Sequence, residues 1–86
     1  MKEAERILKS LANRRRLAIV RYLKGCREAS VGDIADAIKL SLKATLKHLA
    51  LLYAVDIVER EQRSLLMYYR LSKALPRLIG SVIANL

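Results

Sequence analysis

The fold is decided by residues 30–53, which read SVGDIADAIKLSLKATLKHLALLY. Ser30 and Asp33 have the spacing of a capping box, and apolar residues follow them at helical intervals. After a connection of about three residues, Ser41 can cap a second and longer helix. Two helices joined by so short a turn cross sharply, so we predict a helix-turn-helix whose second helix spans about residues 41–53.

Helical spacing divides this second helix into two faces. The predicted core face consists of Leu42, Leu46, Leu49, Leu52 and Tyr53. The predicted outward face consists of Ser41, Lys43, Ala44 and Lys47, with His48 on its flank. Because the second helix of this motif enters the major groove of DNA, the two lysines can reach base edges or phosphates. Leu51 also falls outward, either as an ordinary exposed leucine or as a contact to a thymine methyl.

Residues 57–71 alternate and are rich in β-branched and aromatic side chains, which predicts a β-hairpin with its turn at residues 62–65. A hairpin after the second helix forms a wing, and Arg60 and Arg63 on it could contact DNA backbone or minor groove. Glu59 and Glu61 alternate with Arg60 along the strand. The wing can therefore present a basic face only if these glutamates pair with arginines or point elsewhere.

Three further helices complete the expected fold. Residues 2–11 form an amphipathic helix, and Asn13 can cap the helix that follows. The last helix spans about residues 73–86, with Ser72 as its cap and Pro76 in its first turn. We therefore predict one domain over residues 1–86, mainly α with a small β-hairpin, in the order α-α-α-α-β-β-α.

The charge favours a polyanionic partner. The chain has 17 Lys and Arg against 8 Asp and Glu, a net charge of +9. No acid lies between Glu5 and Glu28, none between Asp36 and Asp56, and none after Glu61. Such gaps create positive patches, which suit DNA, RNA or a membrane surface. Arginines at residues 14–16 begin a helix, where they could be solvated, contact phosphate or pair with a partner's acid.

Several classes of protein are disfavoured. One His, three Gly and no acid near the His in the pattern argue against an enzyme and against a bound cofactor. The single cysteine, Cys26, allows no internal disulfide and suits a reducing cytosol. No apolar run approaches the ~20 residues of a membrane span, and the N-terminus has no signal-peptide pattern. We expect a cytoplasmic protein without a membrane partner.

The last helix is more apolar than the surface of a monomer allows. It carries six large aliphatic residues, more than a small core can cover together with the first helix. We predict a two-fold homodimer, the alternative being that this helix only closes the monomer's own core. The predicted interface residues are Ile7, Leu11, Leu78, Ile79, Val82 and Ile83.

The chain resembles the ArsR/SmtB family of winged-helix repressors over nearly its whole length. The resemblance lies in LKSLANRRRL at residues 8–17, SVGDIADAI at residues 30–38, Leu40-Ser41 with His48-Leu49, and MYYRL at residues 67–71. It implies a homodimeric repressor that dimerises through its first and last helices. It also implies release from operator DNA by a signal, often a metal ion.

The departures from the family pattern concern its signal and its turns. One group of metal-sensing members carries cysteines at the positions of Ser30 and Gly32. Another family site uses Asp, His and Glu on the last helix, and residues 73–86 of this chain contain none of these three residue types. A tight zinc site needs about four ligands, so we predict neither a metal site nor a metal response. The family's turn glycines are Lys39 and Asp56 here, and a left-handed backbone would strain Lys39 more than Asp56. Leu46 stands where the family has a small polar residue, two positions before the histidine of the second helix of the motif.

These features together predict a sequence-specific regulator of transcription that binds double-stranded DNA, a repressor acting as a homodimer. Two alternatives remain at the level of sequence. One is a winged-helix module that binds protein or RNA, because charge alone does not separate the nucleic acids. The other is an architectural protein that binds DNA without sequence preference.

Overall fold

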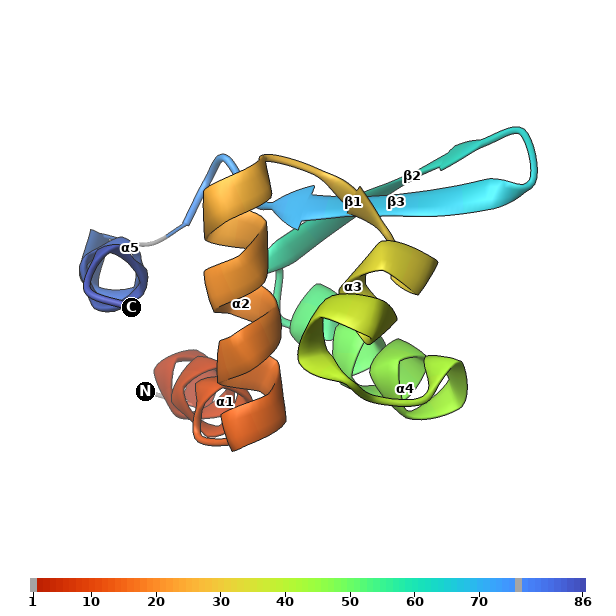
Figure 1. The fold of residues 1–86 in the computed structure, drawn as a ribbon. Coiled ribbons are helices and arrows are strands. Elements are labelled where there is room, and N and C mark those ends of the chain that lie inside the picture. Colours follow the sequence, from red (N-terminus) through yellow and green to blue (C-terminus); the bar gives the residue numbers. More distant parts are fainter. Residues whose placement is uncertain (1, 76) are drawn as a thin grey trace.

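The computed structural model describes residues 2–75 and 77–86, apart from the side chain of Leu78. It confirms a mainly α fold with a small hairpin, and α3 and α4 form the helix-turn-helix (Figure 1). The wing, formed by β2 and β3, projects away from α5 (Figure 1). The elements in order are α1 (Lys2–Leu11), α2 (Arg14–Cys26), β1 (Ala29–Ser30), α3 (Val31–Ile38), α4 (Leu42–Ala54), β2 (Val58–Arg63), β3 (Leu66–Leu71) and α5 (Arg77–Ala84).

Three helices begin at the predicted caps. The Asn13 side chain accepts hydrogen bonds from the backbone N–H groups of Arg15 and Arg16, at 2.9 and 3.1 Å. The Ser30 hydroxyl accepts from the N–H of Asp33 at 3.2 Å. The Ser41 hydroxyl accepts from the N–H three residues later at 3.1 Å and so begins α4. Each cap satisfies backbone donors that the first turn of a helix leaves free.

The turn between α3 and α4 is closed by a left-handed residue. Lys39 has φ 55° and ψ 50°, and the N–H of Leu40 donates to the carbonyl of Ala35 at 3.0 Å. This is the geometry in which a helix commonly ends on glycine. Asp56, after α4, also has a positive φ of 60°. Both positions where the family has glycine are therefore left-handed here, including Lys39, where we expected this backbone to be strained.

The sheet has one strand more than we predicted. β1 pairs antiparallel with β3, Ala29 opposite Tyr69, so the sheet order is β1-β3-β2 rather than a bare hairpin. The wing's turn is also tighter than the predicted residues 62–65, because β2 continues to Arg63, which pairs with Leu66. Ser64 makes the reversal at a φ of 57°.

The last helix begins later than predicted. Ser72 does not cap it, because its hydroxyl accepts from the N–H of Ala74 at 3.2 Å in a local turn. The N–H of Lys73 donates to the carboxylate of Glu59 at 3.1 Å, which holds this turn against β2. α5 accordingly starts at Arg77, and the predicted position of Pro76 in its first turn lies outside the described residues.

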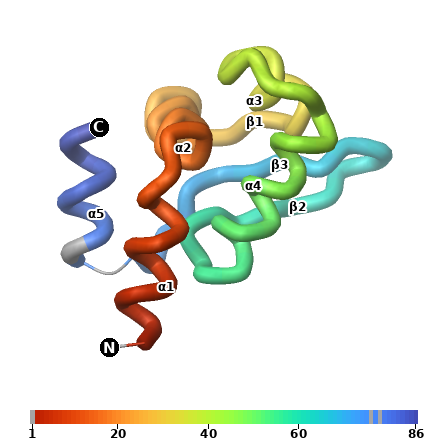
Figure 2. Tube along the Cα trace, turned by 90° about the horizontal axis from the view of Figure 1, so that it is seen from below, coloured from red at the N-terminus to blue at the C-terminus, as the bar shows by residue number. Residues whose placement is uncertain are grey.

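α2 is the centre of the core, with α5 on one side of it and α3 and α4 on the other (Figures 1 and 2). Ile19, Val20 and Leu23 of this helix are at most 1% exposed. No helix within residues 2–75 and 77–86 is both long enough and apolar enough to cross a membrane.

Most of the predicted dimer interface lies inside this core. Ile7, Leu11, Ile79 and Ile83 are only 4–7% exposed and belong to the chain's own hydrophobic cluster. They pack within one chain because α1 and α5 both turn their most apolar face towards the α2 cluster. Val82 keeps 39% of its surface exposed. Leu78 was the sixth residue of the predicted set, and its side chain lies outside the described residues.

Candidate nucleic-acid interface

The buried face of α4 differs from the predicted one. Thr45, Leu49 and Leu52 have no exposed surface, and the Thr45 hydroxyl donates to the carbonyl of Ser41 at 2.8 Å. The predictions for three core positions are wrong: Leu42, Leu46 and Tyr53 are 51%, 42% and 40% exposed. Because α4 is apolar almost all round, its periodicity allowed two registers, and the hydrogen bond of the Thr45 hydroxyl to the carbonyl of Ser41 lets this polar group be buried. Its spacing to Leu49 and Leu52 is the signal that could have identified it.

The lysines of α4 lie on its exposed half, as predicted. Lys43 and Lys47 are one helical turn apart and exposed, while Ala44 beside them is half-buried. Among the described residues, neither lysine takes part in an ion pair. Ser41 is exposed at the start of the helix, where its hydroxyl is already used as the cap. This half of α4 therefore presents two uncompensated positive charges.

His48 connects α4 to α2. Its Nδ1 lies 3.1 Å from Nη1 of Arg16, whose Nε donates to the carbonyl of Ser10 at 2.6 Å. Partial burial lowers the pKa of His48 below its usual value, and the positive charges of Arg16 and Arg15 lower it further. A neutral imidazole can accept the guanidinium hydrogen at Nδ1, and an imidazolium cannot. His48 was predicted at the edge of the DNA-facing set, and the structure gives one of its nitrogens a partner within the chain.

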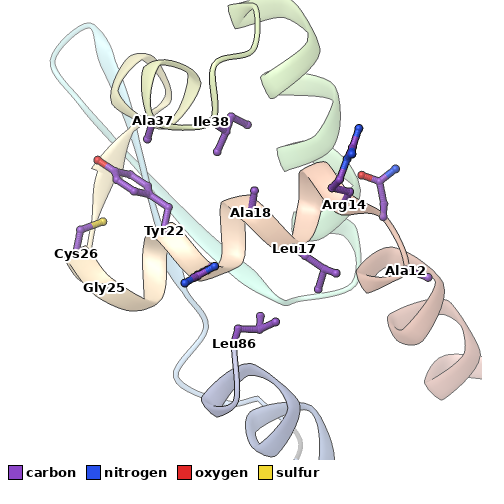
Figure 3. Close-up of a pocket in the computed structure, with 12 residues that line it drawn as sticks. Ala12, Arg14, Leu17, Ala18, Tyr22, Gly25, Cys26, Ala37, Ile38 and Leu86 are labelled. Carbon is purple, nitrogen blue, oxygen red and sulfur yellow. The ribbon is translucent and has the colours of Figure 1, made fainter.

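The three arginines at the start of α2 have different surroundings. Arg16 is half-buried against His48, while Arg14 and Arg15 are exposed. Arg14 lies at one end of a groove of about 1020 Å³ that follows α2 towards Cys26 (Figure 3). Ile38 of α3 and the C-terminal Leu86 flank this groove on opposite sides (Figure 3). Cys26 is half-buried and packs against the core.

The glutamates of the wing pair with arginines, which satisfies the condition set by the sequence. Arg63 makes a two-pronged contact with Glu28, at 2.6 and 2.7 Å, and reaches Glu61 at 3.3 Å. Arg70 contacts Glu59 at 3.0 Å, Glu61 at 3.3 Å and Glu28 at 3.4 Å. These five residues form one network, which we call the wing ion cluster, and its side chains lie on one face of the sheet.

The wing ion cluster shifts the ionisation of its members. Hydrogen bonds from Arg63 are the main cause of the lowered pKa of Glu28 and of Glu61. The backbone N–H of Lys73 is the main cause of the lowered pKa of Glu59. Glu28 in turn raises the pKa of Arg63. Arg63 was predicted to be free for DNA, but its charge is balanced by carboxylates.

Arg60 lies on the opposite face of the wing and reaches α4. Its guanidinium carbon stands 3.8 Å from the centre of the Tyr53 ring, a cation–π contact that joins β2 to α4. Strand alternation separates Arg60 from Glu59 and Glu61, which point into the wing ion cluster. Arg60 is therefore the wing cation on the α4 side, and the acids pair with arginines on the opposite face.

The described residues contain no group of three or more His, Cys, Asp or Glu close enough together to hold a metal ion. Ser30, one of the two positions that the family resemblance associates with metal-binding cysteines, uses its hydroxyl as the cap of α3. A serine hydroxyl is also a poor ligand for the thiophilic metals that cysteines select.

This arrangement defines a class of protein: a helix-turn-helix with a wing, and uncompensated cations on its second helix. A family model described as a helix-turn-helix domain matches residues 11–61, and the chain belongs to this family. Within it, the winged-helix architecture together with the solved regulators described next identifies the chain as a DNA-binding transcription regulator of the ArsR/SmtB winged-helix type. None of the curated proteins compared with the chain matches it significantly.

Solved structures of regulators match almost the whole chain. HlyU from Vibrio cholerae, in its reduced form, is 31% identical over 98% of this chain and 84% of its own, with a TM-score of 0.84. The homodimeric winged helix-turn-helix DNA-binding domain Mb0332 from Mycobacterium bovis, a possible ArsR-family regulator, is 28% identical over 98% and 74%, with a TM-score of 0.83. The repressor BigR from Xylella fastidiosa is 26% identical over 98% and 82%, with a TM-score of 0.80.

Proposed function

We propose that this regulator is a sequence-specific repressor that inserts α4 into the major groove of its operator. The observation that carries the proposal is the separation of charge. Lys43 and Lys47 are exposed and uncompensated on α4, while the nearest acids of the wing are bound in the wing ion cluster. Groove entry by the second helix of a helix-turn-helix brings its N-terminal residues to the bases.

The proposed contacts fall into two groups. Ser41, Lys43, Ala44 and Lys47 line the N-terminal half of α4, and Arg60 extends the positive surface onto the wing. His48 and Arg63 already bond within the chain, so we assign them mainly to positioning α4 and the wing. Because its partner is DNA, we place the protein in the cytoplasm.

The test replaces each lysine of α4 in turn. Lys43→Ala and Lys47→Ala should weaken duplex binding, and each should make the salt dependence shallower by about one counterion. Lys73→Ala is the matched control, because it removes the same charge from an exposed residue in the turn after β3. Fluorescence anisotropy over a salt series measures both quantities. If both α4 variants bind with the parent's affinity and salt slope, the assigned face is wrong.

Competition separates this function from its alternatives. A protein that reads sequence should release a selected duplex much less readily to random duplex than to the unlabelled selected duplex. Equal displacement by random duplex would indicate an architectural protein. Preferential displacement by RNA would indicate an RNA-binding module.

We further propose a homodimer formed through the outer surfaces of α1 and α5. Leu8 is 48% exposed and Val82 is 39% exposed, so each helix keeps an apolar side chain outside the core. The related domain Mb0332 is described as homodimeric. Sedimentation at micromolar concentration should give the parent a mass of about twice 9.8 kDa. The Val82→Asp variant should sediment as a monomer of about 9.8 kDa. A parent that sediments at 9.8 kDa would exclude the dimer.

We also propose that DNA release does not depend on a metal ion. The hydroxyl of Ser30 is engaged in capping α3, and Lys73–Leu86 contains no Asp, His or Glu. Adding zinc in slight excess over protein should leave the affinity for the selected duplex unchanged, and a loss of affinity would contradict this part of the proposal.

A further inference from the structure

α4 carries very few of the side chains with which helices read bases by hydrogen bonds. Its sequence, LKATLKHLALLYA, contains no Arg, Asn, Gln, Asp, Glu or Ser. Thr45 is buried, and the guanidinium of Arg60 covers the Tyr53 ring. Bidentate recognition of guanine or adenine depends mostly on Arg, Asn and Gln. Lys43 and Lys47 are left as the exposed charged side chains of the helix, and lysine often serves phosphate rather than a base.

Two leucines occupy the exposed surface next to these lysines. Leu42 and Leu46 are 51% and 42% exposed and one helical turn apart. Helical geometry places them in a row beside that of Lys43 and Lys47, so the two rows share the N-terminal half of the helix. A helix that inserts this half into the major groove can bring both leucines, on one flank of the lysine row, within reach of base edges. The one large apolar group in the major groove is the C5 methyl of thymine.

We propose that Leu42 and Leu46 determine the sequence specificity of this regulator by packing on thymine methyl groups. This inference rests on the proposed function, since it requires α4 to lie in the major groove. The two leucines are about 6 Å apart along the helix, and base pairs are about 3.4 Å apart, so the two thymines lie about two base pairs from each other in each half-site. The operator is then recognised by apolar contact, with the lysines holding the helix in the groove.

Deoxyuridine gives a direct test because it lacks only the C5 methyl. The full-length chain first selects duplexes from a randomised pool, and each thymine of the best duplex is then replaced singly by deoxyuridine. Loss of one buried methyl should weaken binding by about fourfold at two positions in a half-site. Replacement of the other thymines should have little effect.

The leucine variants connect each methyl to a side chain. Leu42→Ala and Leu46→Ala should bind the thymine duplex more weakly, and each should lose its sensitivity to deoxyuridine at one of the two positions. Leu51→Ala is the matched control, since Leu51 is also 51% exposed on α4 but lies nearer its C-terminal end. It should keep the full deoxyuridine effect at both positions. Thermal unfolding checks that the exposed substitutions leave the fold intact.

The outcomes separate this inference from the function on which it rests. If the parent binds a selected duplex but no deoxyuridine weakens binding, or if both leucine variants keep the full deoxyuridine effect, the inference is overturned and the proposed function stands. If leucine substitutions leave DNA affinity unchanged, these side chains serve another partner and the inference again fails. If the chain selects no duplex at all, the proposed function fails, and the inference fails with it.

Discussion

Lys39→Gly should stabilise the domain, although it removes a side chain from the helix-turn-helix. Lys39 stands at φ 55° and ψ 50°, where a residue with a Cβ costs about 1–2 kcal/mol relative to glycine. Glycine loses about 0.5–1 kcal/mol of that gain, because its unfolded chain has more conformational freedom. The free energy of unfolding should therefore rise by about 0.75 kcal/mol, within a range of about 0–1.5 kcal/mol, and the mid-range value raises the Tm of a chain this size by about 3–6 °C.

Two control variants isolate the backbone effect. Lys39→Ala removes the same side chain but keeps a Cβ in the left-handed region, so its Tm should not rise. Asp56→Gly tests the other turn at φ 60°, where the gain should be smaller because aspartate tolerates this conformation better than lysine. Thermal unfolding followed by circular dichroism measures all three variants. If Lys39→Gly melts no higher than Lys39→Ala, the reasoning about backbone strain is refuted.

Three further predictions concern α4, the wing and the core. Protonation of His48 should destabilise the fold, because its pKa is lower in the folded state than in the unfolded chain. The contribution of His48 to the free energy of unfolding is therefore fully present above about pH 6.5 and decreases as the pH falls below that value. His48→Asn, whose amide oxygen can still accept from Arg16, should remove this histidine's contribution to the pH dependence in chemical denaturation. Arg63→Ala should move the pKa of Glu28, measured by NMR titration, up towards its ordinary value, and it should reduce the salt slope of DNA binding less than Lys47→Ala. Leu49→Ala should lower the free energy of unfolding by about 2–5 kcal/mol in urea, since Leu49 has no exposed surface; a loss below 1 kcal/mol would contradict its place in the core.

The sequence predicted best those features that depend on neighbouring residues. Asn13, Ser30 and Ser41 each cap a helix through a bond to the backbone two or three residues later, so composition and spacing are enough to find them. The family resemblance marked Lys39 and Asp56 as glycine positions, but the residue type of Lys39 spoke against the left-handed turn that the structure has. Ser72 was the exception, because the distant Glu59 binds the turn that follows it.

Contacts between distant residues were not predictable in the same way. Glu28 and Arg63 are 35 residues apart, and Arg16 and His48 are 32 apart, so only the fold reveals that they pair. The strand β1 has two residues and no periodicity of its own. It exists because β3 offers it a free edge.

The faces of apolar helices were the hardest to assign. Hydrophobic periodicity locates a core face only when the other face is polar, and α4 has leucines around most of its circumference. The same difficulty affected α1 and α5, whose apolar residues were expected to exceed what the core of one chain can cover. Their periodicity did not show which of these residues the chain covers itself. The structure answers that Ile7 and Ile83 are covered within the chain, whereas Leu8 and Val82 are not.

The wing ion cluster explains how a wing with acids on it can accompany a DNA-binding helix. Glu59 and Glu61 alternate with Arg60, so the strand geometry alone directs acids and base to opposite faces. Arg70 and Arg63 pair with these two glutamates and with Glu28, so three carboxylates share two guanidinium groups and the cluster keeps one excess negative charge. Pairing cancels most of the field of each member, and the one excess negative charge lies on the face of the wing opposite Arg60. The long-range field near α4 is consequently set by the lysines of that helix and by Arg60, and these are the charges that a DNA backbone meets first.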